Sequence, residues 1–176
     1  KLYLAGKKYL DMNEIKALID QHKYIRSRVI GFIREIEATP YSQEALHWSM
    51  PFGKGRAHIA WQLMHCAATY DRYLNFRILN QEAKYPDLVK AYGNGSVPNP
   101  KLIVKIEEIL SALDITTKPY YNYFESLAPE KIEDKPHLAA EKTHREILHL
   151  LNWHEASHMG QAQITWNAFR AYRGHI

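Results

Sequence analysis

Two histidines near the carboxyl end of the chain have the spacing of a metal-ligand pair. His154 and His158 are four residues apart, so on a helix their imidazoles project from one face, one turn apart. They also lie on an apolar stripe, where two imidazoles are costly unless their nitrogens find partners. A single metal ion satisfies both rings, and hydrogen bonds to backbone carbonyls or buried water are the alternative.

A third histidine favours a metal site over hydrogen bonds as the partner of these rings. His65 lies between Met64 and Cys66 in an otherwise apolar segment, and a histidine on a facing helix completes a three-histidine site with a position open for water or substrate. His58 points the same way but lies about 10.5 Å away along the helix axis, so it is an alternative to His65 and not a fourth ligand. Imidazole donors suit several transition metals, and the sequence leaves Zn, Ni, Fe, Cu and Mn open.

Three polar residues share a helical face with these histidines. Gln62 and Thr69 stand three residues before and four residues after His65, and Gln161 stands three residues after His158. Each is a candidate for orienting a ligand or for contacting a substrate. Gln161 can equally be a polar residue at a helix interface, and no residue is identified as catalytic.

The segment 154–158 also matches the H-E-x-x-H pattern of zinc metalloproteases. That class is excluded because its third ligand comes from further downstream, whereas residues 156–176 contain no Asp or Glu. Gln161 and Ile164 stand where the longer motif has glycine and histidine, and no sheet is predicted before the helix. We therefore expect Glu155 to face solvent or to support a ligand, and not to act as a general base.

The elements that position these residues are helices. Apolar residues recur with the helical period in four segments, and the chain shows no strand alternation. Residues 81–98 form a connection long enough to cross the bundle, so the second and third helices are expected to run parallel. The four segments and their expected signals are residues 13–37 with Asp11 as cap, 57–80 with no good cap, 99–127 opened by Asn99-Pro100 and kinked by Pro119, and 143–173 with a capping box at Thr143.

Composition limits the class of protein. At 176 residues, with 46% hydrophobic and 24% charged residues, the chain is expected to form one globular domain over residues 1–176. No apolar run approaches the length of a membrane span, and the single cysteine excludes an internal disulfide. The basic residues behind the net charge of +4 are scattered. We therefore expect a cytoplasmic protein that binds neither membrane nor nucleic acid.

Two sequence blocks resemble the DinB/YfiT-like proteins. Residues 55–65, G-R-A-H-I-A-W-Q-L-M-H, are similar to the second helix of that family, and residues 154–161, H-E-A-S-H-M-G-Q, to its fourth-helix signature. The resemblance implies an up-down-down-up four-helix bundle, often a homodimer, with a divalent metal on His65, His154 and His158. Several members of the wider superfamily look like enzymes that use low-molecular-weight thiols, including S-transferases.

These observations lead to a functional expectation with alternatives. We expect a metal-dependent enzyme that acts on a small molecule, either a thiol-dependent transferase or a hydrolase. A non-catalytic metal- or small-ligand-binding protein of a stress response is the main alternative. A structural bundle with a vestigial histidine cluster is the third.

Overall fold

The computed structural model describes residues 2–51, 57–99, 101–137 and 140–174, with side chains from residue 14 onward. The described residues are helical and contain no β-strand, which confirms the all-α prediction. The elements are α1 (Leu2–Glu37), α2 (Ser42–His47), α3 (Ile59–Asp71), the π-helical segment η1 (Arg72–Ile78), α4 (Pro86–Tyr92), α5 (Ile106–Ser126), the 3-10 turn η2 (Pro129–Lys131) and α6 (His144–Tyr172).

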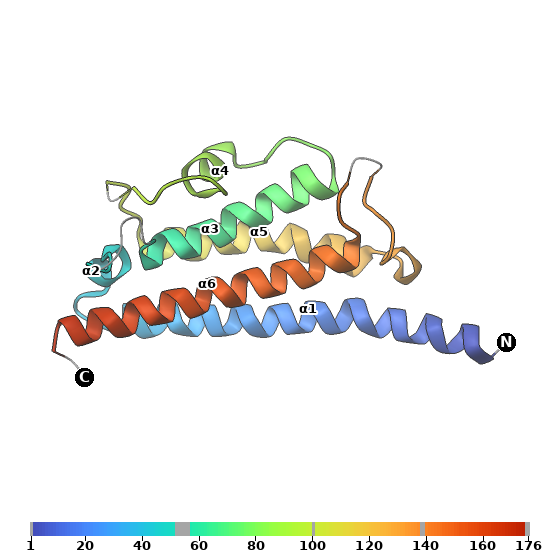
Figure 1. Ribbon diagram of the computed structural model, residues 1–176, viewed down its shortest axis with the longest axis horizontal. Coiled ribbons are helices and arrows are strands. Elements are labelled where there is room, and N and C mark those ends of the chain that lie inside the picture. The colour runs from blue at the N-terminus through green and yellow to red at the C-terminus, as the bar shows by residue number, and fades with distance from the viewer. Residues whose placement is uncertain (1, 52–56, 100, 138–139, 175–176) are drawn as a thin grey trace.

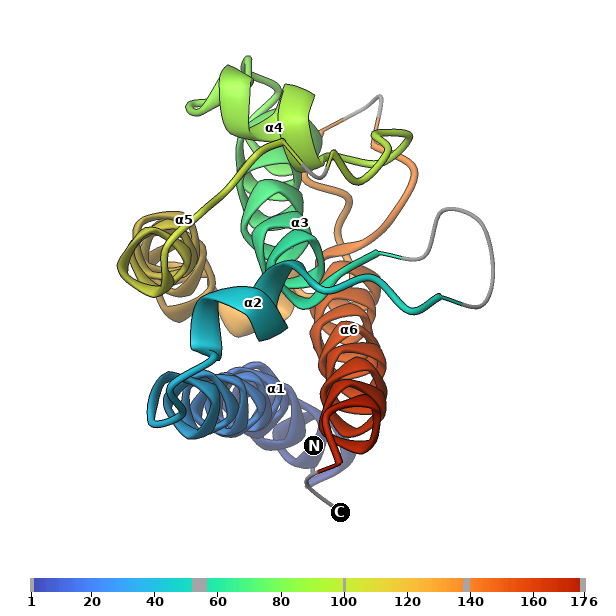
Figure 2. The ribbon, with the colours of Figure 1, turned by 90° about the vertical axis from the view of Figure 1, so that its left-hand side faces the viewer.

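The four long helices surround a common core. Viewed along their length, α3 lies beside both α5 and α6, and α1 closes the ring by packing against α5 and α6 (Figure 2). In Figure 1, α1 and α6 run from right to left, whereas α3 and α5 run from left to right. The crossover that carries α4 passes over the outside of α3, so it is placed to complete a site built on that helix.

The core has two apolar clusters separated by polar residues. One cluster is centred on Ile33, Leu63 and Trp166, and the other on Tyr70 and Phe124. Each large side chain buried in them contributes about 1.5–3 kcal/mol. Between the two clusters stand polar side chains, which are His22 and Arg26 on α1 and His154, Glu155 and His158 on α6.

Two of the expected helix starts are wrong. Helix α1 begins at Leu2 and places Asp11 inside the helix, so Asp11 is not its cap. Helix α5 begins at Ile106 with Lys105 as its cap. Asn99 instead accepts the backbone N–H of Lys101 at 3.0 Å, because the side-chain chemistry that caps a helix also closes a short turn.

Other local expectations had mixed outcomes. The capping box at Thr143 is confirmed by reciprocal bonds with Glu146. Pro119 lies inside α5, which continues through it to Ser126. Helix α3 does have a cap, since His58 Nδ1 accepts the backbone N–H of Trp61 at 3.1 Å. Pro100 lies outside the described residues.

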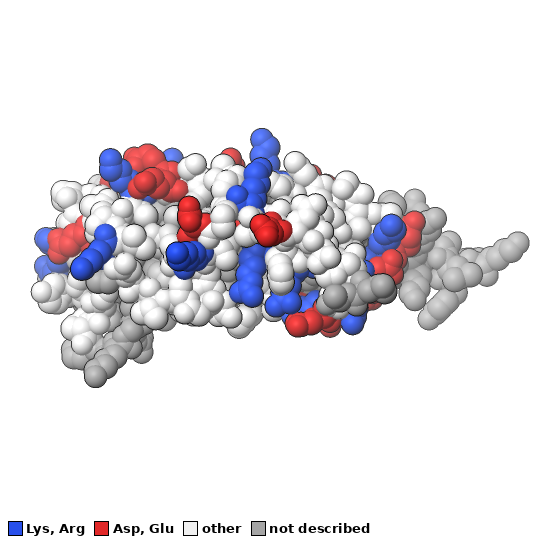
Figure 3. All heavy atoms as spheres, turned by 90° about the horizontal axis from the view of Figure 1, so that it is seen from above, with Lys and Arg blue, Asp and Glu red and all other residues white. Residues whose placement is uncertain are grey.

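The surface carries both signs of charge. On the face seen in Figure 3, Lys and Arg side chains are interspersed with Asp and Glu across the molecule. Within the described residues, none of the helices combines the length and apolar character that crossing a bilayer requires.

Candidate metal centre

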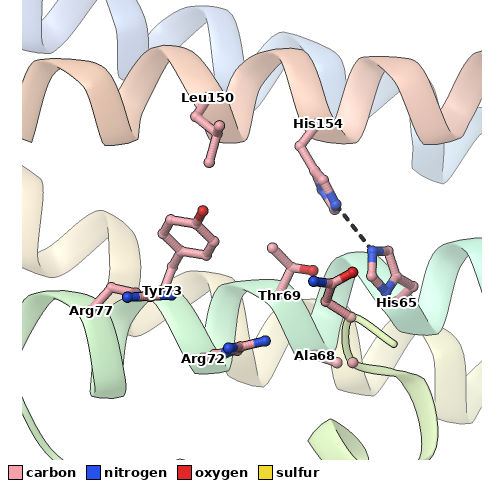
Figure 4. Close-up of a pocket in the computed structure, with 10 residues that line it drawn as sticks. His65, Ala68, Thr69, Arg72, Tyr73, Arg77, Leu150 and His154 are labelled. Atoms are coloured by element: carbon pink, nitrogen blue, oxygen red, sulfur yellow. Dashed lines mark hydrogen bonds between the residues drawn. The ribbon is translucent and has the colours of Figure 1, made fainter. Parts of the chain in front are cut away.

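Three histidine rings converge between α3 and α6. Each of His65, His154 and His158 offers a nitrogen, and these atoms all lie within 4.8 Å of one another. The Nε2 atoms of His65 and His154 are 3.2 Å apart, and a dashed line marks this contact in Figure 4. Nitrogens that bind one tetrahedral ion at about 2.0–2.1 Å are separated by about 3.3 Å. The spacing therefore fits a shared ion.

Hydrogen bonds from outside the cluster set the tautomers of two rings. His65 Nδ1 donates to the carbonyl oxygen of Tyr92 at 2.6 Å, and His158 Nδ1 donates to Gln62 Oε1. Each donation leaves Nε2 with a free lone pair, as a metal ligand needs. Trp61 stacks on His65 at 4.7 Å between ring centroids and limits its rotation.

The third ring is poorly satisfied by protein atoms. His154 Nδ1 is buried and has no hydrogen-bond partner among the described residues, and His154 Nε2 faces another imidazole. Buried polar atoms in folded proteins almost always have partners. An ion between the Nε2 atoms of His154 and His65 would give both of these nitrogens a partner, so the donor set fits a metal at Nε2, while Nδ1 of His154 has no partner within the described residues.

The three rings are held neutral. Burial lowers the pKa of His154 to about 3, helped by the neighbouring His158 and His65. Burial and the nearby His65 lower the pKa of His158 to about 4. Burial also lowers the pKa of His65, against the opposing effect of its bond to Tyr92. All three imidazoles are therefore uncharged at neutral pH, so each has a nitrogen lone pair that can bind a metal ion.

A comparison with models of protein families gives the family of this chain. Residues 21–162 match the model of the DinB superfamily. The chain belongs to the DinB superfamily. The matched range includes all three histidines, and the resemblance of the two sequence blocks is thereby confirmed. A comparison with curated proteins found no match.

The crossover of this DinB-superfamily chain is part of the site. Asp71, at the end of α3, accepts the backbone N–H groups of Lys84 at 3.3 Å and Tyr85 at 3.0 Å. These bonds fix the start of α4, whose last residue is Tyr92, the partner of His65. Residues 81–98 were expected only as a connection, and the buried carboxylate of Asp71 has no local sequence signal that reveals its role.

The three polar candidates all lie at the site. Gln62 is 4% exposed, and it contacts His158 through Oε1 and donates through Nε2 to Gln161 Oε1 at 3.1 Å. Thr69 lies on α3 one turn beyond His65 and lines the same cavity. Among the described residues, Gln161 is therefore linked to His158 through Gln62, whereas Gln62 contacts His158 itself.

Glu155 does not face solvent, contrary to that part of the expectation. It is 1% exposed and accepts Arg26 Nε at 2.6 Å and Arg26 Nη2 at 2.7 Å. Burial raises the pKa of Glu155, but the hydrogen bonds and charge of Arg26 outweigh this effect and hold the pKa well below its usual range. Because Arg26 also donates to the carbonyl of Leu113, the ion pair joins α6 to α1 and α5 beside His154.

Three further side chains are structural. His22 is fully buried, with Nδ1 2.6 Å from the hydroxyl of Tyr121 and Nε2 hydrogen-bonded to Tyr70. Burial raises the pKa of the Cys66 thiol well above its ordinary value, so Cys66 is an inert core residue. His58 caps α3 and does not belong to the histidine cluster. The alternative ligand is therefore excluded.

The histidine cluster opens into a cavity of about 230 Å³. Figure 4 shows His65, Thr69, Arg72, Tyr73 and Arg77 along the α3–η1 side, with His154 and Leu150 reaching from α6. The cavity is also lined by Ala68, Gly93 and Asn94. A small molecule in this space would lie against His65, His154 and several polar side chains at once.

Proposed function

We propose that this DinB-superfamily protein is a metal-dependent enzyme, either a thiol-dependent transferase or a hydrolase, acting on a small molecule. The observation that carries the proposal is the convergence of His65, His154 and His158 beside an open cavity. Three neutral imidazoles leave part of the coordination sphere of an ion to water or substrate. The up-down-down-up order of the superfamily is proposed as well, supported by the helix directions in Figure 1.

The residues around the cluster have distinct roles in this proposal. When bound, a divalent ion lowers the pKa of a coordinated thiol or water and stabilises negative charge. The carbonyl of Tyr92 and the amide of Gln62 keep two imidazoles turned inward. The hydroxyl of Thr69 and the amide of Asn94 line the cavity and are placed to orient a polar substrate.

The first experiment measures the metal content of the purified protein. We expect the purified protein to hold one equivalent of a transition metal by inductively coupled plasma mass spectrometry, and His154→Ala and His158→Ala each to lose it. His149→Ala is the matched control, because His149 lies on α6 and its side chain is 58% exposed. Full metal content in either ligand variant would show that the site is wrongly assigned.

The second experiment separates an enzyme from a binding protein. Metal-loaded protein is incubated with glutathione, bacillithiol or water and a panel of electrophiles and esters, and product is measured by mass spectrometry. Turnover that disappears in His154→Ala supports the enzyme. Intact metal without turnover on any substrate favours the alternative, a non-catalytic metal- or small-ligand-binding protein.

A further inference from the structure

The cavity beside the histidines has a strongly positive wall. Arg72 and Arg77 line it, and its lining contains no Asp or Glu among the described residues. Within the described part of the chain, no carboxylate lies within 4 Å of Arg72, which is half-buried. Arg77 has one such neighbour, Glu141 at 3.7 Å, but that carboxylate is 72% exposed. A pair of this kind is weak, so both guanidinium groups remain able to bind a ligand.

The π-helical segment brings the two arginines together. In an α-helix, residues five apart project about 140° from one another, so Arg72 and Arg77 could not both face one cavity easily. In η1 the turn is wider, and the N–H of Leu79 donates to the carbonyl of Leu74, five residues earlier, at 2.9 Å. Such turns are rare and frequently occur at functional sites. Here the turn brings both arginines to the cavity wall.

We propose that this cavity selects ligands that carry an anionic group, a carboxylate or a phosphate, bound by Arg72 with help from Arg77 while the reacting part of the ligand faces the histidines. The inference rests on the proposed function and names its substrate class. Guanidinium groups present planar, paired donors that match the oxygens of both anions. A divalent ion would add to the uncompensated positive charge and attract an anion further.

The spacing along the helix limits the size of the ligand. His65 and Arg72 are seven residues apart, which is about 10.5 Å along a helix axis, and the arginine side chain can shorten the gap. Thr69 and Tyr73 line the cavity along the same stretch. A matching ligand therefore has its anionic group several bonds from its reacting atom, with a polar or short aliphatic part between them.

The direct test uses calorimetry on metal-free protein, titrated with glutarate and with inorganic phosphate. We expect at least one anion to bind, and its identity shows whether the site prefers a carboxylate or a phosphate. Arg72→Gln should weaken binding about tenfold, equivalent to about 1.4 kcal/mol, and Arg77→Gln should weaken it less. Arg28→Gln, an exposed arginine on α1, should change nothing.

A second titration links the anion site to the histidines. With zinc-loaded protein, 6-mercaptohexanoate should bind about tenfold tighter than the neutral 6-mercaptohexanol, and Arg72→Gln should abolish the difference. The inference is overturned if neither anion binds to the metal-free protein at millimolar concentration. It is also overturned if folded Arg72→Gln and Arg77→Gln, checked by circular dichroism, bind the anions as tightly as the wild type.

Metal content measured on the protein as purified, before metal is removed or added, separates the two proposals. Full metal content with no anion binding rejects the anion site and leaves the metal centre standing. Anion binding that depends on Arg72, in a protein that retains no metal, rejects the metal-dependent function and leaves the anion site standing.

Discussion

Replacing Gln62 with leucine tests whether the hydrogen bonds that orient the histidines determine the affinity for metal. The side chain of Gln62 is 4% exposed, and its Oε1 accepts the Nδ1–H of His158. Leucine has nearly the same volume and removes the acceptor without opening a cavity. We therefore expect the fold to persist and the affinity for metal to fall.

The size of the loss follows from the tautomer of His158. When Nε2 binds an ion, the proton must sit on Nδ1, and a buried donor without a partner costs about 1–3 kcal/mol. In the metal-free protein the ring can move that proton to Nε2 and avoid most of the cost. The penalty therefore falls on the metal-bound state, and we expect zinc affinity to drop about tenfold to a hundredfold.

The assay is competition for zinc against a chromophoric chelator at pH 7.5. Gln62→Glu is the informative companion, because a carboxylate also accepts from His158 Nδ1 and should keep or raise the affinity. Gln163→Leu is the control, since Gln163 lies on α6 and bonds Asn167 away from the histidines. Zinc affinity of Gln62→Leu within twofold of the wild type, in a folded protein, would refute the role assigned to this hydrogen bond.

Three further predictions concern stability. Glu155→Ala leaves the buried charge of Arg26 without a partner and should lower the free energy of unfolding in urea by about 3–5 kcal/mol. The double variant Arg26→Met/Glu155→Leu should recover most of this loss. A loss below about 1 kcal/mol in the single variant would contradict the prediction. Gly93→Ala places a methyl group against the carbonyl of the preceding turn. The free energy of unfolding in urea should therefore fall by about 1–3 kcal/mol, and competition with a chelator should show a lower affinity for zinc. Gly31→Ala, whose added methyl group meets no neighbour, should cause neither loss. The pKa of His58 is lowered to about 4 by burial and by its neighbour His47, so below pH 6.5 the unfolded chain binds the extra proton and His58 destabilises the fold as pH falls from 6.5 to 4. His58→Asn keeps a helix cap. The metal-free variant should therefore lose less stability than the metal-free wild type between pH 7 and pH 4.5. An equal loss would show that His58 does not contribute to the pH dependence.

The four long helices were predictable because their apolar residues repeat with a single period over many turns. The ends were not, since the signals there are short and ambiguous. Asn99 has the chemistry of a helix cap and closes a turn instead. Helix α4 has seven residues, too few for a period to stand out, so it was absorbed into an expected connection.

The histidines of the candidate site could be found because two of them share one helix face and the third interrupts an apolar segment. The partners that orient them could not be found in the same way. Tyr92 contributes a backbone carbonyl, which leaves no trace in the residue type, and it reaches His65 only because Asp71 holds the crossover against α3. Glu155 appeared free to face solvent because its partner Arg26 lies on a helix distant in sequence.

The buried ion pair is better explained by the register of α6 than by net stability. Apolar cores tolerate small changes of packing at modest cost, whereas a rotation of α6 by one residue, about 100°, would carry His154 and His158 away from His65. The two bonds between Arg26 and Glu155, together with the bond from Arg26 to the carbonyl of Leu113, are satisfied in one arrangement of α1, α5 and α6. Replacing such a pair with apolar residues often leaves a protein as stable as before. A charged pair in the layer next to three converging imidazoles therefore makes physical sense as the contact that holds them at the distance an ion requires.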